Sequence, residues 1–232
     1  MIRVTENFRK IQDLLAKAAV EAGRGPETVR LLAASKTQSP ETVLEAASVG
    51  QRDFGENFAR EGIDKMAALA RTDLIWHFIG YLQSNKTRAV AEHFSWVHTV
   101  DRIKIAERLS KQRPHHAGDL NVCIQVNIDN ERGKAGVAAS DTMQLAQAMV
   151  GLPRLRFRGL MCIPAIHGNM EEQRKPFARM RELAESLGEA GIPVDTLSMG
   201  MTGDYVAAIA EGATIVRIGT ALFGPRGNQQ TI

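Results

Sequence analysis

The sequence predicts a single α/β domain built as a (β/α)8 TIM barrel, and three observations carry this prediction. The chain has 232 residues, and α/β barrels commonly occupy about 200–250 residues as one domain. Short apolar runs alternate with segments of helical periodicity along the chain. No linker or low-complexity tract interrupts this alternation, so we expect one domain over residues 1–232. A doubly wound open sheet is the alternative that the same alternation allows.

The expected elements begin with an amphipathic helix over residues 5–22, in which Phe8, Ile11 and Leu15 recur at helical spacing. Apolar runs that we interpret as strands then follow at residues 30–35, 52–55, 74–80, 96–100, 121–128, 155–163, 195–199 and 214–219. Eight strands separated by helical segments favour a closed barrel over an open sheet.

Helix start and stop signals stand between these strands. Ser39, followed by a proline at the first helical position, is a candidate cap, as are Asp101 and Asp141. Gly50 and Gly151 stand where helices commonly end.

Composition excludes several classes of protein. The 29 Lys and Arg residues nearly balance 26 Asp and Glu residues, and no basic run exceeds two residues, so no nucleic-acid partner is expected. No apolar run approaches the ~18 residues that a membrane span needs, and the N-terminus lacks the apolar core of a secretory signal. Cys123 and Cys162 lie in apolar runs, which indicates reduced packing residues, and no residues show metal-ligand spacing. We therefore expect a cytoplasmic protein without a membrane or metal partner.

The chemistry of a barrel lies where its strands end. Lys36 directly follows the first predicted strand, and residues 198–204 and 217–220 follow the last two with glycines and hydroxyls. Glycine permits close backbone approach, and barrels often hold phosphate at these two loops, near helix N-termini. Arg217 has apolar neighbours and therefore needs either an internal carboxylate or a ligand. The set suggests a phosphorylated ligand with a carbonyl that Lys36 attacks.

Several runs also resemble a known family. They are SKTQSPE (35–41), FGENF (54–58), WHFIGYLQSNK (76–86), LRFRGLMCIPA (155–165), SMGMTGD (198–204) and VRIGTALFG (216–224). In order and spacing these runs closely resemble the pyridoxal phosphate homeostasis protein family over nearly the whole chain.

This resemblance implies a monomeric barrel of the alanine-racemase N-terminal-domain type, the third fold type of proteins that bind pyridoxal 5′-phosphate (PLP). It implies PLP held as a Schiff base on Lys36, with Arg217 facing the pyridine nitrogen. The further cofactor-binding residues that it implies are Asn57, Ser198, Gly200, Thr202, Gly219 and Thr220. It also suggests apo forms of PLP-dependent enzymes as recipients of the cofactor.

Two positions depart from the family pattern. Tyr81 stands where the family usually has a proline, which puts the shape of the third strand-to-helix loop in doubt. Thr202 stands where serine is common, and there the hydroxyl is retained.

The expected function follows from Arg217 and from the absence of an obvious second base. An arginine offers only hydrogen-bond donors, so it would leave the ring nitrogen unprotonated, and such a ring is a poor electron sink. This argues against a transaminase. A racemase needs a second base beside the lysine, and the only tyrosines, Tyr81 and Tyr205, are expected on barrel loops. The chain also ends twelve residues after Thr220, which leaves no room for a racemase's second domain.

We therefore expect a PLP-binding protein that buffers or delivers the cofactor without substrate turnover. A single-domain amino-acid racemase of low activity is the alternative, and a Schiff-base aldolase acting on a sugar phosphate is a third hypothesis. Two roles remain possible for Lys86 and Lys134: each is either simply exposed to solvent or contacts a phosphate or a second aldehyde.

Overall fold

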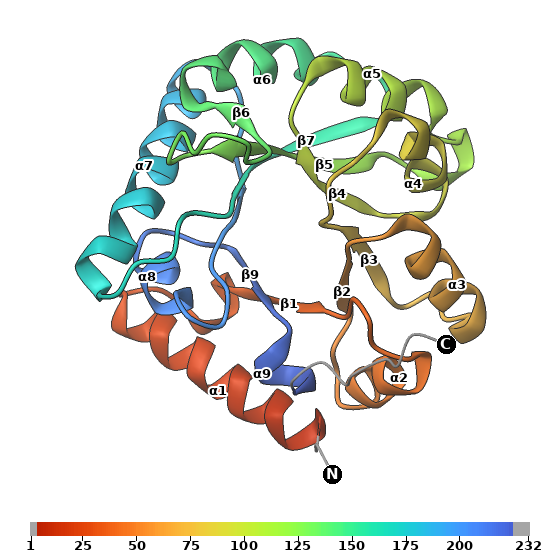
Figure 1. Ribbon diagram of the computed structural model, residues 1–232, viewed down its shortest axis with the longest axis vertical. Helices are drawn as coiled ribbons and strands as arrows, with labels where there is room; N and C mark the ends of the chain where they lie inside the picture. The colour runs from red at the N-terminus through yellow and green to blue at the C-terminus, as the bar shows by residue number, and fades with distance from the viewer. Residues whose placement is uncertain (1–3, 225–232) are drawn as a thin grey trace.

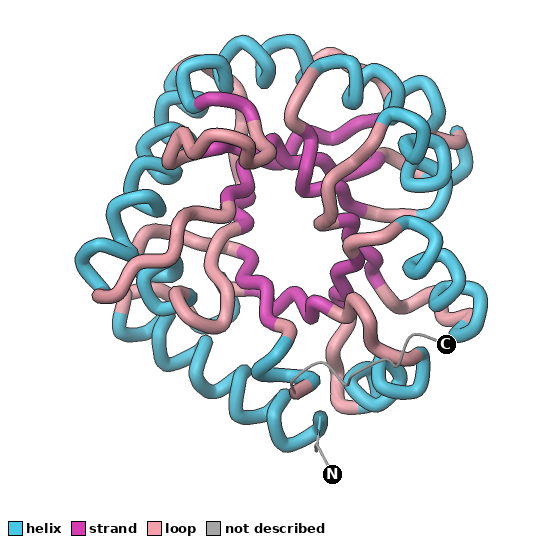
Figure 2. Tube along the Cα trace, viewed as in Figure 1, coloured by secondary structure: helices cyan, strands magenta, loops and turns pink. Residues whose placement is uncertain are grey.

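The structure is a computed structural model that describes residues 4–224, so the ends of the predicted domain, 1–3 and 225–232, lie outside the described residues. Within 4–224, eight parallel strands close into a barrel (Figure 2). They are β1 (Arg30–Ala34), β2 (Asp53–Glu56), β3 (Ile75–Phe78), β4 (Trp96–Val100), β5 (Leu120–Asn127), β7 (Leu155–Cys162), β8 (Thr196–Ser198) and β9 (Ile215–Ile218). The pairing of β4 with β5, at Val97 and Val122, completes the ring, so the predicted barrel is confirmed and the open sheet is wrong.

Helices surround the strands as an outer ring (Figure 1). In the described part of the chain they are α1 (Val4–Glu21), α2 (Pro40–Ser48), α3 (Ala59–Leu69), α4 (Thr87–His93), α5 (Ile103–Gln112), α6 (Thr142–Val150), α7 (Met170–Glu189), α8 (Tyr205–Ala210) and α9 (Thr220–Phe223). The predicted first helix is therefore confirmed. It packs against α8 and α9, which follow the last two barrel strands.

The predicted caps have different outcomes. The Ser39 hydroxyl accepts a hydrogen bond from the Thr42 N–H at 3.3 Å, as expected of a cap. The prediction for Asp101 is wrong, because α5 begins two residues later and the Asp101 carboxylate pairs with Arg102 instead. Asp141 makes no side-chain cap either, since it ends a 3₁₀ turn that leads into α6.

One element was missed by the sequence reasoning. A two-residue strand, β6 (Val137–Ala138), pairs in parallel with β5 outside the barrel ring. Two half-buried residues are too few to give a strand pattern in a sequence.

Side chains alternate along each strand between the barrel interior and the layer beneath the helices. An apolar cluster fills part of the interior and comprises Leu32, Trp96, Cys123, Met161 and Ile215. β1 lies between β2 and β9, with Leu32 beside Arg217 and Ala33 beside Ile218. This register brings the segment after β1 next to the segment after β9, which is the edge where function was expected.

Candidate cofactor site

Lys36 begins the turn that follows β1, and its neighbours fix the turn firmly. The Ser35 N–H donates to the Gly55 carbonyl at 3.0 Å, and the Ser35 hydroxyl donates to Glu56 Oε1 at 2.6 Å. Thr37 adopts a positive φ of 66°, which is strained for a β-branched residue. Its N–H donates to Glu61 Oε1 at 2.5 Å. Lys36, half-buried between these residues, therefore leaves the barrel wall at a defined place.

A buried lysine is hydrogen-bonded to this turn and to the two carboxylates beside it. Lys65 of α3 donates through Nζ to the Ser35 carbonyl at 2.7 Å, to Glu56 Oε1 at 2.8 Å and to Glu61 Oε1 at 2.7 Å. Burial raises the pKa of the Glu56 carboxyl, although Lys65 opposes the shift. The sequence reasoning missed this cluster, because Glu61 and Lys65 have the four-residue spacing of an ordinary surface helix pair.

Arg217 lies in the barrel interior, and only 5% of it is exposed. Its Nη1 donates to the Ser198 carbonyl at 2.6 Å and to Ser198 Oγ at 2.9 Å, and its Nη2 donates to the Cys162 carbonyl at 2.8 Å. A guanidinium has five N–H groups, so these three bonds leave two N–H groups for a ligand. Within residues 4–224 Arg217 forms no ion pair with a carboxylate, so the internal salt bridge considered from the sequence is not found there.

The turns after β8 and β9 lie beside each other at the same edge. Gly200 has a φ of 93°, and a Cβ there would come within 2.6 Å of the Ala208 Cβ. A Cβ on Gly219 would lie 3.2 Å from the Ala34 carbonyl oxygen. Both positions therefore favour glycine, and both bring backbone close to neighbouring elements. The hydroxyl-bearing residues Thr202 and Thr220 are exposed here, and their implied contacts with a phosphate stay predictions.

Ser198 occupies a different place from the threonines. Its hydroxyl is fully buried beneath Arg217, from which it accepts a hydrogen bond, and it lies 2.8 Å from Nδ1 of His98. Its implied contact with the cofactor stays a prediction, since the hydroxyl is already engaged inside the barrel.

Asn57, just after β2, lines a cavity of about 520 Å³ beside the turns after β2 and β3, together with Phe58, Tyr81 and Lys86. Tyr81 is 57% exposed, and its ring lies 5.8 Å from the Arg102 guanidinium carbon. The departure from the family pattern thus places an aromatic ring in the wall of this cavity. Lys134 does not line this cavity and forms an ion pair with Glu131.

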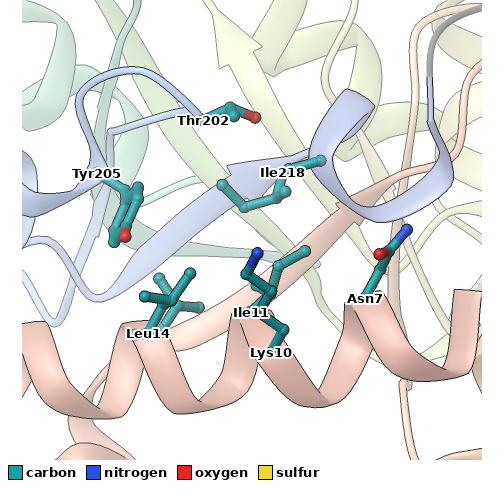
Figure 3. A pocket seen from close by; sticks show the side chains of 9 residues that line it. Asn7, Lys10, Ile11, Leu14, Thr202, Tyr205 and Ile218 are labelled. Carbon is teal, nitrogen blue, oxygen red and sulfur yellow. The ribbon is translucent and has the colours of Figure 1, made fainter.

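A second pocket, of about 330 Å³, lies between α1 and the last two strand-to-helix turns. Figure 3 shows Thr202, Tyr205 and Ile218 facing Lys10 and Leu14 of α1 across this pocket. Ile218 follows inward-facing Arg217 in β9, so this pocket lies outside the barrel wall. Tyr205, expected from the sequence on a barrel loop, is the first residue of α8 and packs against the core.

The described residues offer neither a membrane span nor a metal site. No helix among residues 4–224 has the length and apolar character needed to cross a bilayer. The same residues contain no group of three His, Cys, Asp or Glu side chains arranged to hold a metal ion.

Together, a lysine after β1, a buried arginine in β9 and two glycine turns beside it define a ligand-binding parallel barrel of the alanine racemase type. The alanine racemase N-terminal domain family matches residues 4–227. Two relatives named pyridoxal phosphate homeostasis protein come from Pseudomonas aeruginosa, with 54% identity over 97% of both chains, and Escherichia coli K12, with 48% identity over 96% of this chain and 97% of the relative. The chain belongs to the pyridoxal phosphate homeostasis protein family.

Solved structures agree with this assignment. PipY of Synechococcus elongatus with PLP bound is 35% identical, has a TM-score of 0.84, and is matched over 95% of this chain and 100% of that one. An alanine racemase of Clostridium difficile is 15% identical with a TM-score of 0.77, over 99% of this chain and 58% of the racemase. At that identity the racemase supports the fold alone.

Proposed function

We propose that this protein binds PLP at the mouth of the barrel through a Schiff base on Lys36, and that it buffers or delivers the cofactor without turning over a substrate. The observation that carries the proposal is Arg217, a buried cation with two unused N–H groups, one strand away from Lys36. The names of the relatives and the PLP-bound structure of PipY support it.

The residues present fit each part of PLP. The Lys36 amine would condense with the aldehyde and release one water molecule. Backbone and hydroxyl groups of the two turns, at Gly200, Thr202, Gly219 and Thr220, would bind the phosphate, and Asn57 would border the ring from β2. The bound cofactor would supply an aldehyde and an electron-accepting ring. Arg217 would donate to the ring nitrogen and keep it unprotonated, which weakens the ring as an electron sink and argues against transaminase chemistry.

The alternative function is a PLP-dependent amino-acid racemase of low activity. The observation that favours it is Tyr81, which lines the same cavity as Asn57 and has an arginine beside its ring. Tyr205 offers no comparable support, because it packs toward α1 outside the barrel wall. Under the leading proposal the recipients of PLP are apo forms of PLP-dependent enzymes, and the protein acts as a cytoplasmic monomer.

The experiment that tests the proposal uses the purified protein. We expect visible Schiff-base absorbance, which borohydride reduction abolishes, and a pyridoxyl label that peptide mass spectrometry locates on Lys36. Lys36→Ala should lose the absorbance, whereas Lys134→Ala, in a different loop, should retain it. A colourless wild-type protein loaded with PLP, or a label confined to another lysine, would overturn the proposal.

A second measurement separates carrier from racemase. The loaded protein is incubated with single enantiomers of amino acids, and chiral chromatography follows the opposite enantiomer. Sustained racemisation that Lys36→Ala abolishes and Tyr81→Phe reduces would favour the enzyme. Sedimentation at micromolar concentration tests the monomer, for which we expect a mass near 25.4 kDa.

A further inference from the structure

A continuous chain of buried hydrogen bonds crosses the barrel interior below Arg217. Ser198 Oγ, which accepts from Arg217, lies 2.8 Å from His98 Nδ1. His98 Nε2 lies 2.9 Å from His77 Nδ1, and His77 Nε2 lies 2.9 Å from Asp53 Oδ1. Both imidazoles are completely buried. The chain therefore links residues of β9, β8, β4, β3 and β2, which are distant in sequence.

The donor and acceptor roles in this chain follow from its carboxylate end, given that both imidazoles are neutral. His77 carries its proton on Nε2 and donates to Asp53, an acceptor when ionised. His77 Nδ1 then accepts from Nε2 of His98. His98 Nδ1 is left as an acceptor for the Ser198 hydroxyl, whose oxygen accepts from Arg217. Every bond thus runs in the same direction, from the arginine to the carboxylate.

Burial favours the neutral form of both imidazoles. Burial lowers the pKa of His77, although Asp53 opposes the shift. Burial lowers the pKa of His98 further, with the positive charges of Arg217 and Arg30 acting in the same direction. The carboxylate of Asp53 also pairs with Arg30 at 3.4 Å, near the opposite end of the barrel. Neutral imidazoles with the stated tautomers are therefore the expected form at neutral pH.

Packing restricts both rings. The Trp96 indole stacks on His77 at a centroid separation of 5.3 Å and lies 5.6 Å from the His98 ring. The Arg158 guanidinium covers that indole at 4.7 Å. Because both rings pack against Trp96 and are hydrogen-bonded at both nitrogens, they fix the direction of the Ser198 hydroxyl.

Building on the proposed function, we propose that His98 and His77 are positioning residues, which hold Arg217 through Ser198 so that its two unused N–H groups face the ring nitrogen of PLP. Histidines that served only to fill the core would need partners, but no particular direction. Here the direction matters, because a Ser198 hydroxyl without its acceptor could rotate its hydrogen toward the guanidinium. That rotation would remove one of the three bonds that orient Arg217.

The first test concerns the protein without PLP. Histidine-selective ¹⁵N NMR distinguishes the two neutral tautomers and the imidazolium, and the chain has six histidines to assign. We expect His77 and His98 to carry the proton on Nε2 between about pH 6 and 8, with His77→Gln and His98→Asn assigning the signals. A proton on Nδ1 of His98, or an imidazolium at either position, would overturn the directed chain.

The second test loads the variants with PLP that carries ¹⁵N in its ring. His98→Phe removes the acceptor, and we expect a changed ring-nitrogen chemical shift together with PLP release that is roughly tenfold faster or more. His98→Asn offers Oδ1 in place of Nδ1 and should restore both readouts. Met161→Leu repacks the same interior without touching the chain and should move neither.

The outcomes separate this inference from the function on which it rests. Wild-type protein without Schiff-base absorbance or a Lys36 label contradicts the proposed function itself. Wild-type protein that binds PLP normally, while His98→Phe keeps its ring shift and release rate, contradicts only the positioning role. If circular dichroism shows that His98→Phe does not fold, Ser198→Ala breaks the same link and should change the ring shift in the same direction. An unchanged shift in that variant would equally overturn the inference.

Discussion

At the scale of single residues, the buried ammonium of Lys65 has the largest expected effect on stability. Lys65→Met removes three hydrogen bonds and leaves Glu56 buried without its cation. Removing one partner of a buried ion pair typically costs about 3–5 kcal/mol, and we expect that loss in the free energy of unfolding at pH 7. Urea titration measures it. Exchanging both partners, as in Lys65→Met with Glu56→Met, should recover most of the loss, and failure to recover would contradict this assignment.

The stability loss in Lys65→Met should also depend on pH. The pKa of Glu56 is already raised by burial, and loss of Lys65 removes a charge that lowers it. A carboxyl whose pKa is raised in the folded state stabilises the fold below its unfolded pKa, about 4.3, and this contribution is lost as the pH rises through the folded value. The destabilisation of Lys65→Met should therefore be largest at neutral pH and shrink toward pH 4. A pH-independent difference between variant and wild type would contradict the ionised Glu56.

The cysteines give a simpler residue-scale prediction. Cys123 and Cys162 are free and buried, and burial raises the pKa of each thiol to about 12. At pH 8 only about one thiol in ten thousand would then be the reactive thiolate. We expect no reaction of the native protein with Ellman's reagent and reaction of both thiols in denaturing urea. Rapid labelling of the native protein would contradict the buried positions.

At the scale of elements, the turn after β8 depends on the conformation of one glycine. Gly200→Ala would combine a positive φ with a Cβ 2.6 Å from that of Ala208, and we expect a loss of about 1–3 kcal/mol in stability. Weaker PLP binding should accompany it, since the turn is part of the proposed phosphate site. Gly203→Ala is the matched control, because its Cβ would meet nothing within 4 Å. Denaturant titration measures the stability of both variants, and equal losses of stability would contradict the strain argument.

Elements also show what the sequence could predict. Most strands were predictable because they are short apolar runs that alternate with helical segments, and closure of the barrel makes β1 and β9 neighbours. The absence of a cap at Asp101 could not be predicted, because a carboxylate beside Arg102 bonds its neighbour as readily as the helix backbone. Lys36 and Gly200 stood out in the sequence because each follows a predicted strand, and Arg217 because it is a charged residue inside an apolar run.

The contacts beneath the site could not be predicted in the same way. Ser198 and His98 are a hundred residues apart, and only the spatial arrangement of β4 and β8 brings them together. In the sequence His98 is a histidine within an apolar run, and nothing there indicates its partner. The sequence therefore predicts which residues reach the mouth of the barrel, whereas the structure is needed to show what orients them.

At the scale of the whole molecule, the site joins the first and last strands of the barrel, because Lys36 follows β1 and Arg217 lies in the neighbouring strand β9. An unfolded chain keeps the lysine but loses the other contacts, so PLP should bind the folded state preferentially and stabilise it. At a PLP concentration of 100 times Kd the stabilisation is about 2.7 kcal/mol. For a domain of this size that corresponds to a rise in Tm of about 5–10 °C.

Thermal unfolding with and without PLP measures this shift, and two comparisons locate its source. Lys36→Ala keeps the turns and Arg217 but cannot form the Schiff base, so its shift should be clearly smaller than that of the wild type. Inorganic phosphate occupies only the turns and should give the wild type a smaller shift than PLP does. Equal PLP shifts in wild type and Lys36→Ala would mean that PLP stabilises the fold without the covalent bond, and the assignment of Lys36 would then be wrong.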